Sequence, residues 1–292
     1  MDNITEKQNS KSKRIDTLST LEILSVINKE DQSIASIVEK VIPDIKLVVD
    51  CIVHNFKNGG RLFYFGCGTS GRLGVLDASE CPPTFSVSKR LVRGVIAGGN
   101  KALVESVEKA EDSLSKGKHD VLKNKINKFD TVIGISAIGT ANYVHGALIQ
   151  AKKKKAQTVL VCCNNYKKHK YVDYVISAIV GPEIIAGSTR MKAGTATKMI
   201  LNMISTTAMI KLNKVYDNLM VDVKVSNKKL FNRAINIISN ICSCDLKYAR
   251  MALNKSKGNV KVAIIMQNKN LSFLQSVKLL DKYNGNLRMA LK

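Results

Sequence analysis

A glycine-rich turn is the sharpest chemical feature of the sequence. Residues Phe65 to Arg72 read FGCGTSGR, after a short apolar run and before a helical pattern. Glycines let a backbone turn tightly and approach a ligand, and the N-terminus of the following helix offers unpaired N–H groups and a partial positive charge to an anion. The turn therefore has the geometry of a phosphate cradle.

The same turn matches the spacing of a dinucleotide-binding loop, because Gly66, Gly68 and Gly71 satisfy GxGxxG. A dinucleotide fold places an acidic residue about 20 residues further on, at the end of the next strand, to hold the ribose. The next apolar run, Leu91–Ala97, has no acid at its end, and the Thr69-Ser70 pair supplies hydroxyl donors suited to a terminal phosphate. We favour a sugar-phosphate loop over a dinucleotide loop, and both over a plain tight turn.

Carboxylates follow this turn in two clusters. The first is Asp77 to Pro83 (DASECPP), and the second is Ala110-Glu111-Asp112, about thirty residues on. Two carboxylates at the rim of one phosphate site can act as general acid and general base. On spacing alone the pattern is equally typical of solvated surface residues.

The elements that must position these groups begin with helices. Ser19 or Thr20 can cap a helix that has Leu21, Leu24 and Ile27 on one face, and a second helix starts near Pro43 and stops at Asn58-Gly59-Gly60. Five short apolar runs follow, each succeeded by a turn and a helical pattern. The runs are Leu62–Phe65, Leu91–Ala97, Thr131–Ile135, Thr158–Cys162 and Tyr174–Val180. Because they are apolar throughout rather than alternating, they predict a doubly wound α/β fold with a parallel five-stranded sheet.

The last third of the chain is predicted to be helical. A long helix starts near Gly194-Thr195 and extends to about Tyr216, and shorter helical pieces beyond Ser226 are separated by Gly258-Asn259 and Gly285-Asn286. We predict a helical N-terminal segment (1–54), a sugar-phosphate domain (55–225) and a small helical C-terminal domain (226–292).

Composition indicates a folded, water-soluble chain, and its positive net charge favours anionic ligands. The 292 residues are 45% hydrophobic and carry a net charge of +23, but the lysines are scattered and aromatic residues are few, which favours a solvated surface over a nucleic-acid groove. Seven cysteines without a CxxC spacing and four isolated histidines fit neither a disulfide framework nor a metal site. The start is polar, and the apolar stretch Met199–Ile210 is too short to span a bilayer. We expect a reducing, cytoplasmic location, without cofactor, membrane or nucleic-acid partner.

Several long motifs resemble the N-acetylmuramic acid 6-phosphate etherase family, and the resemblance extends over essentially the whole chain. They are Leu18–Glu22 (LSTLE), Gly66–Pro83 (GCGTSGRLGVLDASECPP), Ile96–Gly99 (IAGG), Glu108–Asp112 (EKAED), Gly181–Glu183 (GPE), Gly187–Thr195 (GSTRMKAGT), Asn218–Val223 (NLMVDV) and Gly258–Lys261 (GNVK).

The resemblance implies a sugar isomerase (SIS) domain in a homodimer, and a C-terminal domain similar to ubiquitin-associated three-helix folds. It also implies cleavage of the D-lactyl ether of N-acetylmuramic acid 6-phosphate by elimination and water addition, giving N-acetylglucosamine 6-phosphate and D-lactate without metal or cofactor. The family's two catalytic glutamates fall on Glu80, taken as the acid toward the ether oxygen, and Glu111, taken as the base at C2. The residues expected to bind the substrate are Gly66, Gly68, Thr69, Ser70, Gly71, Arg72, Ser136, Gly139, Thr140, Ser188, Thr189, Arg190 and Lys192.

One loop departs from the family pattern. Residues Ser136 to Tyr143 read SAIGTANY where the family has roughly AASGRTPY, so a cation and two hydroxyl groups are replaced. Ala186 and the loop Cys162 to Lys168 depart to a smaller degree. Loss of one charge-assisted hydrogen bond costs about 1.5–3 kcal/mol of binding, which predicts a raised KM rather than lost chemistry. The alternative is a sugar-phosphate-binding regulator without activity, similar to the glucokinase regulatory protein.

Overall fold

The computed structural model describes residues 3–107, 109–223, 225 and 227–292. Glu108, in one of the resemblance motifs, and residue 226, a predicted domain boundary, lie outside the described residues. Packing divides the chain into two compact units, Met1–Ser79 with Arg90–Ser205, and Glu80–Lys89 with Thr206–Lys292. The domain boundaries that we derived from sequence stay a prediction.

A parallel sheet forms the centre of the first unit. Its five strands in the described residues are β1 (Leu62–Gly66), β2 (Val92–Ile96), β3 (Thr131–Ile135), β4 (Gln157–Cys162) and β5 (Tyr174–Ser177), in the order β2-β1-β3-β4-β5. The predicted five-stranded sheet is confirmed. Two strands are shorter than predicted: β2 lacks the predicted Leu91 and Ala97, and β5 ends at Ser177, which pairs with Cys162 at the end of β4, instead of at Val180.

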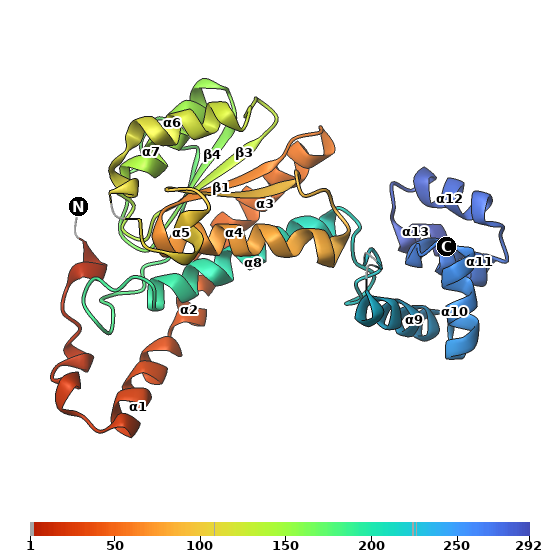
Figure 1. Ribbon diagram of the computed structural model, residues 1–292, viewed down its shortest axis with the longest axis horizontal. Coiled ribbons are helices and arrows are strands. Elements are labelled where there is room, and N and C mark those ends of the chain that lie inside the picture. Colours follow the sequence, from red (N-terminus) through yellow and green to blue (C-terminus); the bar gives the residue numbers. More distant parts are fainter. Residues whose placement is uncertain (1–2, 108, 224, 226) are drawn as a thin grey trace. The chain divides into compact units, whose positions relative to one another are not determined.

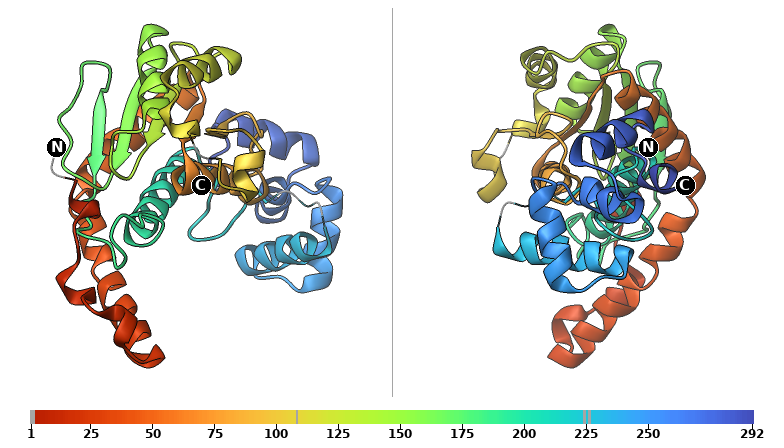
Figure 2. Two further views of the ribbon diagram at one scale, coloured as in Figure 1. Left: turned by 60° about the vertical axis from the view of Figure 1, so that its left-hand side comes forward. Right: turned by 90° about the vertical axis from the view of Figure 1, so that its right-hand side faces the viewer.

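Helices cover both faces of this sheet (Figures 1 and 2). The helices of this region are α1 (Thr20–Asp31), α2 (Ile34–Glu39), α3 (Ile42–Lys57), α4 (Gly68–Phe85), α5 (Lys101–Val104), α6 (Leu114–Lys123), α7 (Asn142–Lys153) and α8 (Lys192–Lys211). Phe63 and Phe65 of β1 pack against α7, whereas the intervening Tyr64 donates its hydroxyl proton to Asp77 of α4. This alternation confirms the doubly wound arrangement.

The strand order places the loops after β1 and β3 side by side. The chain leaves β1 toward β2 on one side and later returns to β3 on the other, which makes the β1/β3 boundary the topological switch point of the sheet. In open α/β sheets, ligands bind at the carboxyl ends of the strands at such a point. The loops that begin at Gly66 and Ser136 therefore meet where the fold favours a ligand.

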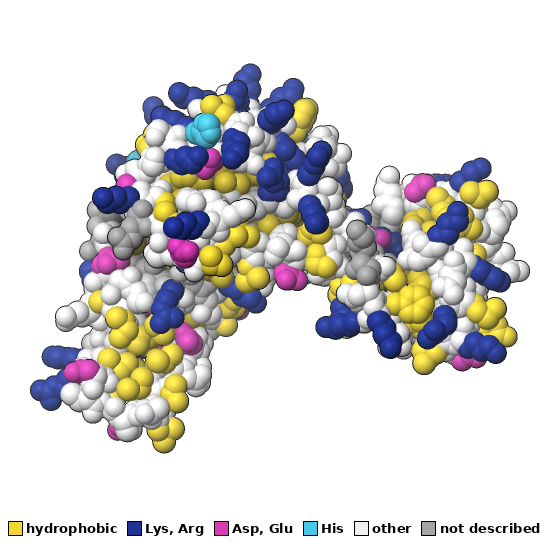
Figure 3. Space-filling model, in the orientation of Figure 1, with side chains coloured by type: hydrophobic (Ala, Val, Ile, Leu, Met, Phe, Trp, Pro, Cys, Tyr) yellow, Lys and Arg dark blue, Asp and Glu magenta, His cyan; other side chains and the backbone are white. Residues whose placement is uncertain are grey.

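The N-terminal segment is attached to the first unit by specific hydrogen bonds. Asn164, after β4, accepts from Ile4 N and Thr5 N through Oδ1, and Ser12 donates to the carbonyl of Ile184. Helix α1 follows the predicted Ser19 cap, but Leu21 and Leu24 on its apolar face remain 75% and 58% exposed. Hydrophobic side chains accordingly gather on the surface of this helix (Figure 3).

Helix α8 ends at Lys211, not near Tyr216 as predicted. The chain turns at Asn213, whose φ of 62° lies in the left-handed region, and Tyr216 then pairs with Leu219 in an isolated bridge. No helix in the described part of the chain is long and apolar enough to cross a bilayer. On the face shown in Figure 3, Lys and Arg side chains are dispersed among uncharged ones.

The C-terminal helical region is confirmed, but its described residues form five helices rather than three. They are α9 (Lys228–Cys242), α10 (Leu246–Lys255), α11 (Val260–Lys269), α12 (Phe273–Lys282) and α13 (Leu287–Leu291). The extra divisions have a local cause, because each helix starts at a side chain that caps its own first turn. These caps are Asn227, Asp245, Asn259, Ser272 and Asn286.

Candidate functional site

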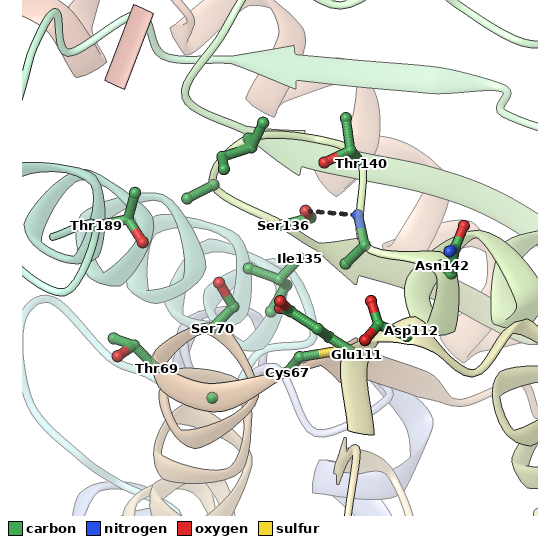
Figure 4. A pocket seen from close by; sticks show the side chains of 14 residues that line it. Cys67, Thr69, Ser70, Glu111, Asp112, Ile135, Ser136, Thr140, Asn142 and Thr189 are labelled. Atoms are coloured by element: carbon green, nitrogen blue, oxygen red, sulfur yellow. Dashed lines mark hydrogen bonds between the residues drawn. The ribbon is translucent and has the colours of Figure 1, made fainter. Parts of the chain in front are cut away.

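A cavity of about 280 Å³ lies at the carboxyl ends of β1 and β3 (Figure 4). It is bounded by the loop that leads into α4, the loop that leads into α7, the 3-10 turn Ala110–Asp112, and Thr189. The lining residues are Cys67, Gly68, Thr69, Ser70, Glu111, Asp112, Ile135, Ser136, Ala137, Ile138, Thr140, Ala141, Asn142 and Thr189.

The first loop contributes hydroxyl groups and the start of a helix. Thr69 and Ser70 line the cavity, and Ser70 extends toward its centre (Figure 4). Gly66 and Gly71 do not line it, but they allow the tight turn: a Cβ on Gly66 would lie 2.7 Å from Gly71 N, and a Cβ on Gly71 would lie 2.7 Å from Gly66 O. The two glycines are needed for the backbone shape, and the N-terminus of α4 is directed at the cavity.

The second loop is organised by Ser136. Its Oγ accepts hydrogen bonds from Gly139 N at 3.1 Å and Ala141 N at 3.4 Å. Gly139 has a φ of 88°, which only glycine adopts readily. Helix α7 then begins at Asn142, so two helix N-termini border one cavity. Free N–H groups at helix starts and neighbouring hydroxyl groups together favour an anionic ligand.

Two carboxylates also border the cavity, Glu111 and Asp112, from the turn after Lys109. The Glu111 side chain extends toward the centre of the cavity, near Ser70 (Figure 4). Burial, together with the charges of Glu111 and Asp112, raises the pKa of the neighbouring Cys67 to about 12. Cys67 is therefore a neutral thiol, which leaves Glu111 and Asp112 as the candidate general bases of the cavity.

Glu80 does not line this cavity. It is an exposed residue of α4, twelve positions after Gly68, which at the rise of an α-helix is about 18 Å along the axis from the start of the helix. Asp112 is a second carboxylate that lines the cavity, and the motifs in the sequence predict no role for it. Its position directly after Glu111 in the EKAED motif is the signal from which its place at the cavity could have been predicted.

The predicted cationic residues lie elsewhere, and no Lys, Arg or His of the described residues lines the cavity. Arg72 donates to the carbonyls of Leu103 at 3.1 Å and Glu105 at 2.9 Å. Arg190 is exposed and, like Ser188, does not line the cavity. An anion would be held here by N–H and hydroxyl groups alone.

Lys192 forms a buried ion pair with Glu30. Its Nζ lies 2.7 Å from Glu30 Oε2 and 3.0 Å from the carbonyl oxygen of Pro182. Burial on its own would raise the pKa of Glu30, but hydrogen bonds from Lys11, Lys192 and Asn9 outweigh it and lower this pKa to about 2. The pair joins α1 to the first turn of α8.

A second cavity, of about 260 Å³, shares Cys67, Gly68 and Glu111 with the first. Arg72 and Lys109 are among its other lining residues, with Ala97, Ala102, Ser106, Val107 and Ala110. Glu111 therefore stands between a cavity lined by hydroxyl groups and one that also has cations in its wall.

Comparison with known proteins gives two kinds of match. Residues 44–152 match the family model described as the glucokinase regulatory protein N-terminal SIS domain, and residues 217–278 match its C-terminal lid domain. The chain is 52% identical to N-acetylmuramic acid 6-phosphate etherase 1 of Bacillus licheniformis, over 98% of this chain and 95% of that protein. It is 49% identical to the enzymes of the same name from Bacillus subtilis and Clostridium botulinum, which it matches over 99% and 100% of its length and 95% and 98% of theirs.

The chain belongs to the N-acetylmuramic acid 6-phosphate etherase family. Full-length identity to proteins of that name supports the etherase interpretation over the regulator. The two matched regulatory-protein models cover separate parts of the chain and identify the shared architecture.

Several etherase-family motifs have structural roles in this chain. Asp77 of the DASE segment accepts from Tyr64 Oη, Asn202 Nδ2 and Ser205 Oγ, which joins α4 to β1 and α8. Glu183 of the GPE motif accepts from Lys192 N and Ala193 N and so caps α8.

In the second unit, Lys261 of the GNVK motif donates to Asp222 of the NLMVDV motif at 2.7 Å. The same Nζ donates to the carbonyls of Asn213 at 2.6 Å and Gly285 at 2.8 Å. At these positions the motif residues make hydrogen bonds that hold parts of the fold together.

Proposed function

We propose that this protein is an N-acetylmuramic acid 6-phosphate etherase that releases D-lactate and N-acetylglucosamine 6-phosphate. The observation that carries the proposal is Glu111, a carboxylate of the etherase-family EKAED motif that lines a cavity bordered by two helix N-termini. Carbonyl chemistry explains the need for such a base. In the open-chain sugar, the hydrogen on C2 is acidic because it is α to the aldehyde.

The reaction proceeds as an elimination followed by an addition. Glu111 takes the C2 proton, the bond between C3 and the ether oxygen breaks, and a second acid protonates the departing lactate oxygen. Water then adds across the double bond between C2 and C3, with its oxygen on C3 and a proton returned to C2. A positioned acid or base contributes about 10²–10⁴-fold to such a step. The phosphate is bound by Ser70, Thr69 and the N–H groups at the start of α4.

We further propose that the protein is a homodimer in which Glu80 of one copy serves the cavity of the other. Three observations support it: Glu80 is about 18 Å along α4 from the cavity loop, Leu76 one turn earlier is 51% exposed, and Leu21 and Leu24 leave an apolar face uncovered. The competing source of the acid is Asp112, which lines the cavity beside Glu111.

A complementation experiment separates these two sources. Glu80→Gln and Glu111→Gln are prepared alone and as mixed dimers. If each site combines residues from two copies, every mixed dimer contains one intact site, and random pairing restores about a quarter of the parental lactate release. If Glu80 and Glu111 act within one copy, the mixture stays as inactive as the single variants. A Glu80→Gln variant with parental activity would assign the acid to Asp112.

The proposal includes a cytoplasmic location and a role in recovering amino sugar from the cell wall, as the family resemblance implies. Seven cysteines are free in the described residues, which fits a reducing compartment. D-lactate release from N-acetylmuramic acid 6-phosphate tests the function directly. The regulator would be supported if N-acetylglucosamine 6-phosphate binds but no lactate is released.

A further inference from the structure

His145 contacts the second cavity loop from the side of α7. Its Nε2 lies 2.8 Å from the carbonyl oxygen of Gly139, and its Nδ1 lies 3.2 Å from the hydroxyl oxygen of Tyr171. A neutral ring with its proton on Nε2 satisfies both contacts, because it donates to the carbonyl and accepts from the phenol. Burial lowers the pKa of His145, the hydrogen bond to Gly139 opposes this, and the nearby His169 lowers the pKa again, so that the net lowering favours the neutral form.

Aromatic side chains hold the imidazole in place. The ring of Tyr166 stacks on it at a centroid distance of 6.2 Å and an interplanar angle of 14°. His169 meets it edge-on and itself stacks on Tyr171 at 5.2 Å. Tyr166 also packs beneath the loop, since a Cβ on Gly139 would lie 3.1 Å from its ring. The imidazole therefore has little freedom to leave the Gly139 carbonyl.

The contact fixes the direction of one peptide group. Gly139 is bound on both sides, by Ser136 Oγ at its N–H and by His145 at its carbonyl. In a planar trans peptide the carbonyl and the following N–H point in opposite directions. The N–H of Thr140 is therefore directed away from His145. Thr140 lines the cavity, and its N–H has no hydrogen-bond partner within the described residues.

We propose that His145 is a positioning residue that holds the Gly139–Thr140 peptide so that the Thr140 N–H donates to the phosphate of the bound sugar. The inference rests on the proposed function for the identity of the ligand. The Thr140 N–H is a backbone donor, so it is available to the phosphate although position 140 has no cationic side chain where the family pattern has Arg. A phosphate bound in this way depends on the residues that orient the loop backbone.

The test compares His145→Leu, which removes the donor to Gly139, with His145→Gln, whose side-chain amide can donate in its place. We expect His145→Leu to weaken N-acetylglucosamine 6-phosphate binding about tenfold in calorimetry and to raise KM equally, while kcat changes little. His145→Gln should restore most of the affinity. In protein labelled with ¹⁵N-threonine, the Thr140 amide resonance should shift on adding this sugar phosphate to the parent and to His145→Gln.

The outcomes separate this inference from the proposed function. If the parent releases no lactate, the proposed etherase function is wrong. The positioning role of His145 can still be tested in that case, by comparing sugar-phosphate binding in the parent and the variants. Equal affinity in the parent and His145→Leu overturns the positioning role, and so does an unmoved Thr140 resonance in the parent. If His145→Leu does not fold, Tyr171→Phe provides the second test, because losing the contact to Nδ1 should weaken binding about two- to threefold. Unchanged binding in Tyr171→Phe would then overturn the inference.

Discussion

Adding a cation to the cavity is the change whose effect can be worked out most directly from the structure. Thr140 and Ile138 line the cavity, which no cation of the described residues reaches. Thr140→Arg with Ile138→Ser adds a charge-assisted donor and a hydroxyl group. A hydrogen bond to a charged group contributes about 1.5–3 kcal/mol, which corresponds to about a ten- to hundredfold lower KM.

The gain should fall near the lower limit, because Glu111 and Asp112 line the same cavity and pair with a new Arg. A paired Glu111 is less available to take a proton, so kcat should fall while KM falls. The assay is D-lactate release over a range of substrate concentrations. Thr140→Gln with Ile138→Ser is the matched control, since it adds length and a donor but no charge. If the Arg variant folds and its KM equals that of the control, the phosphate is not bound in this cavity.

The other predictions use the same assay or unfolding measurements. Glu111→Gln should lower kcat by about 10²–10⁴-fold and leave N-acetylglucosamine 6-phosphate binding nearly unchanged in calorimetry; turnover near the parental rate would remove Glu111 from the mechanism. Ser70→Ala should raise KM more than it lowers kcat, because the hydroxyl binds the anion in ground and transition states alike, and equal KM values would contradict this role. Lys192→Met removes the buried one of the two lysines that pair with Glu30, and because Lys11 remains, the free energy of urea unfolding at pH 7 should fall by less than about 3–5 kcal/mol, the cost of a fully unpaired buried charge. Since the pKa of Glu30 is lowered from 4.5 to about 2, its contribution to the free energy of unfolding is present above pH 4.5 and should be lost as pH falls toward 2; Lys192→Met should flatten that part of the pH profile.

The sheet and the first loop could be predicted because their signals are local. Five apolar runs gave five parallel strands in the described residues, and the glycines at 66 and 71 have the steric role that their spacing indicates. Glu111 was placed at the cavity by its motif. In each of these cases the property depends on a few consecutive residues and on strand order, which the chain pattern specifies.

The partners of the cationic side chains could not be predicted, because these partners lie far away in the sequence. Lys192 lies in a motif that suggests substrate contact, but its partner Glu30 is 162 positions away in the sequence. Nothing in the local pattern distinguishes a lysine that binds phosphate from one that joins two helices. The same holds for His145, whose two partners come from the preceding loop and from the segment after β4.

The departure of the second loop from the family pattern has a physical explanation in this arrangement. A loop that binds an anion through backbone N–H groups presents the same donors whichever side chains stand at positions 138 and 140. Its geometry depends instead on the residues that hold the backbone: the Ser136 hydroxyl accepts two N–H groups, Gly139 takes a φ of 88°, and His145 holds the carbonyl. Substitution should therefore be tolerated at 138 and 140 and costly at 136 and 139. The carbonyl of Ala137 fits this account, because Cys163 N at 2.8 Å and Asn164 Nδ2 at 3.2 Å fix it in turn, and with it the direction of the next N–H.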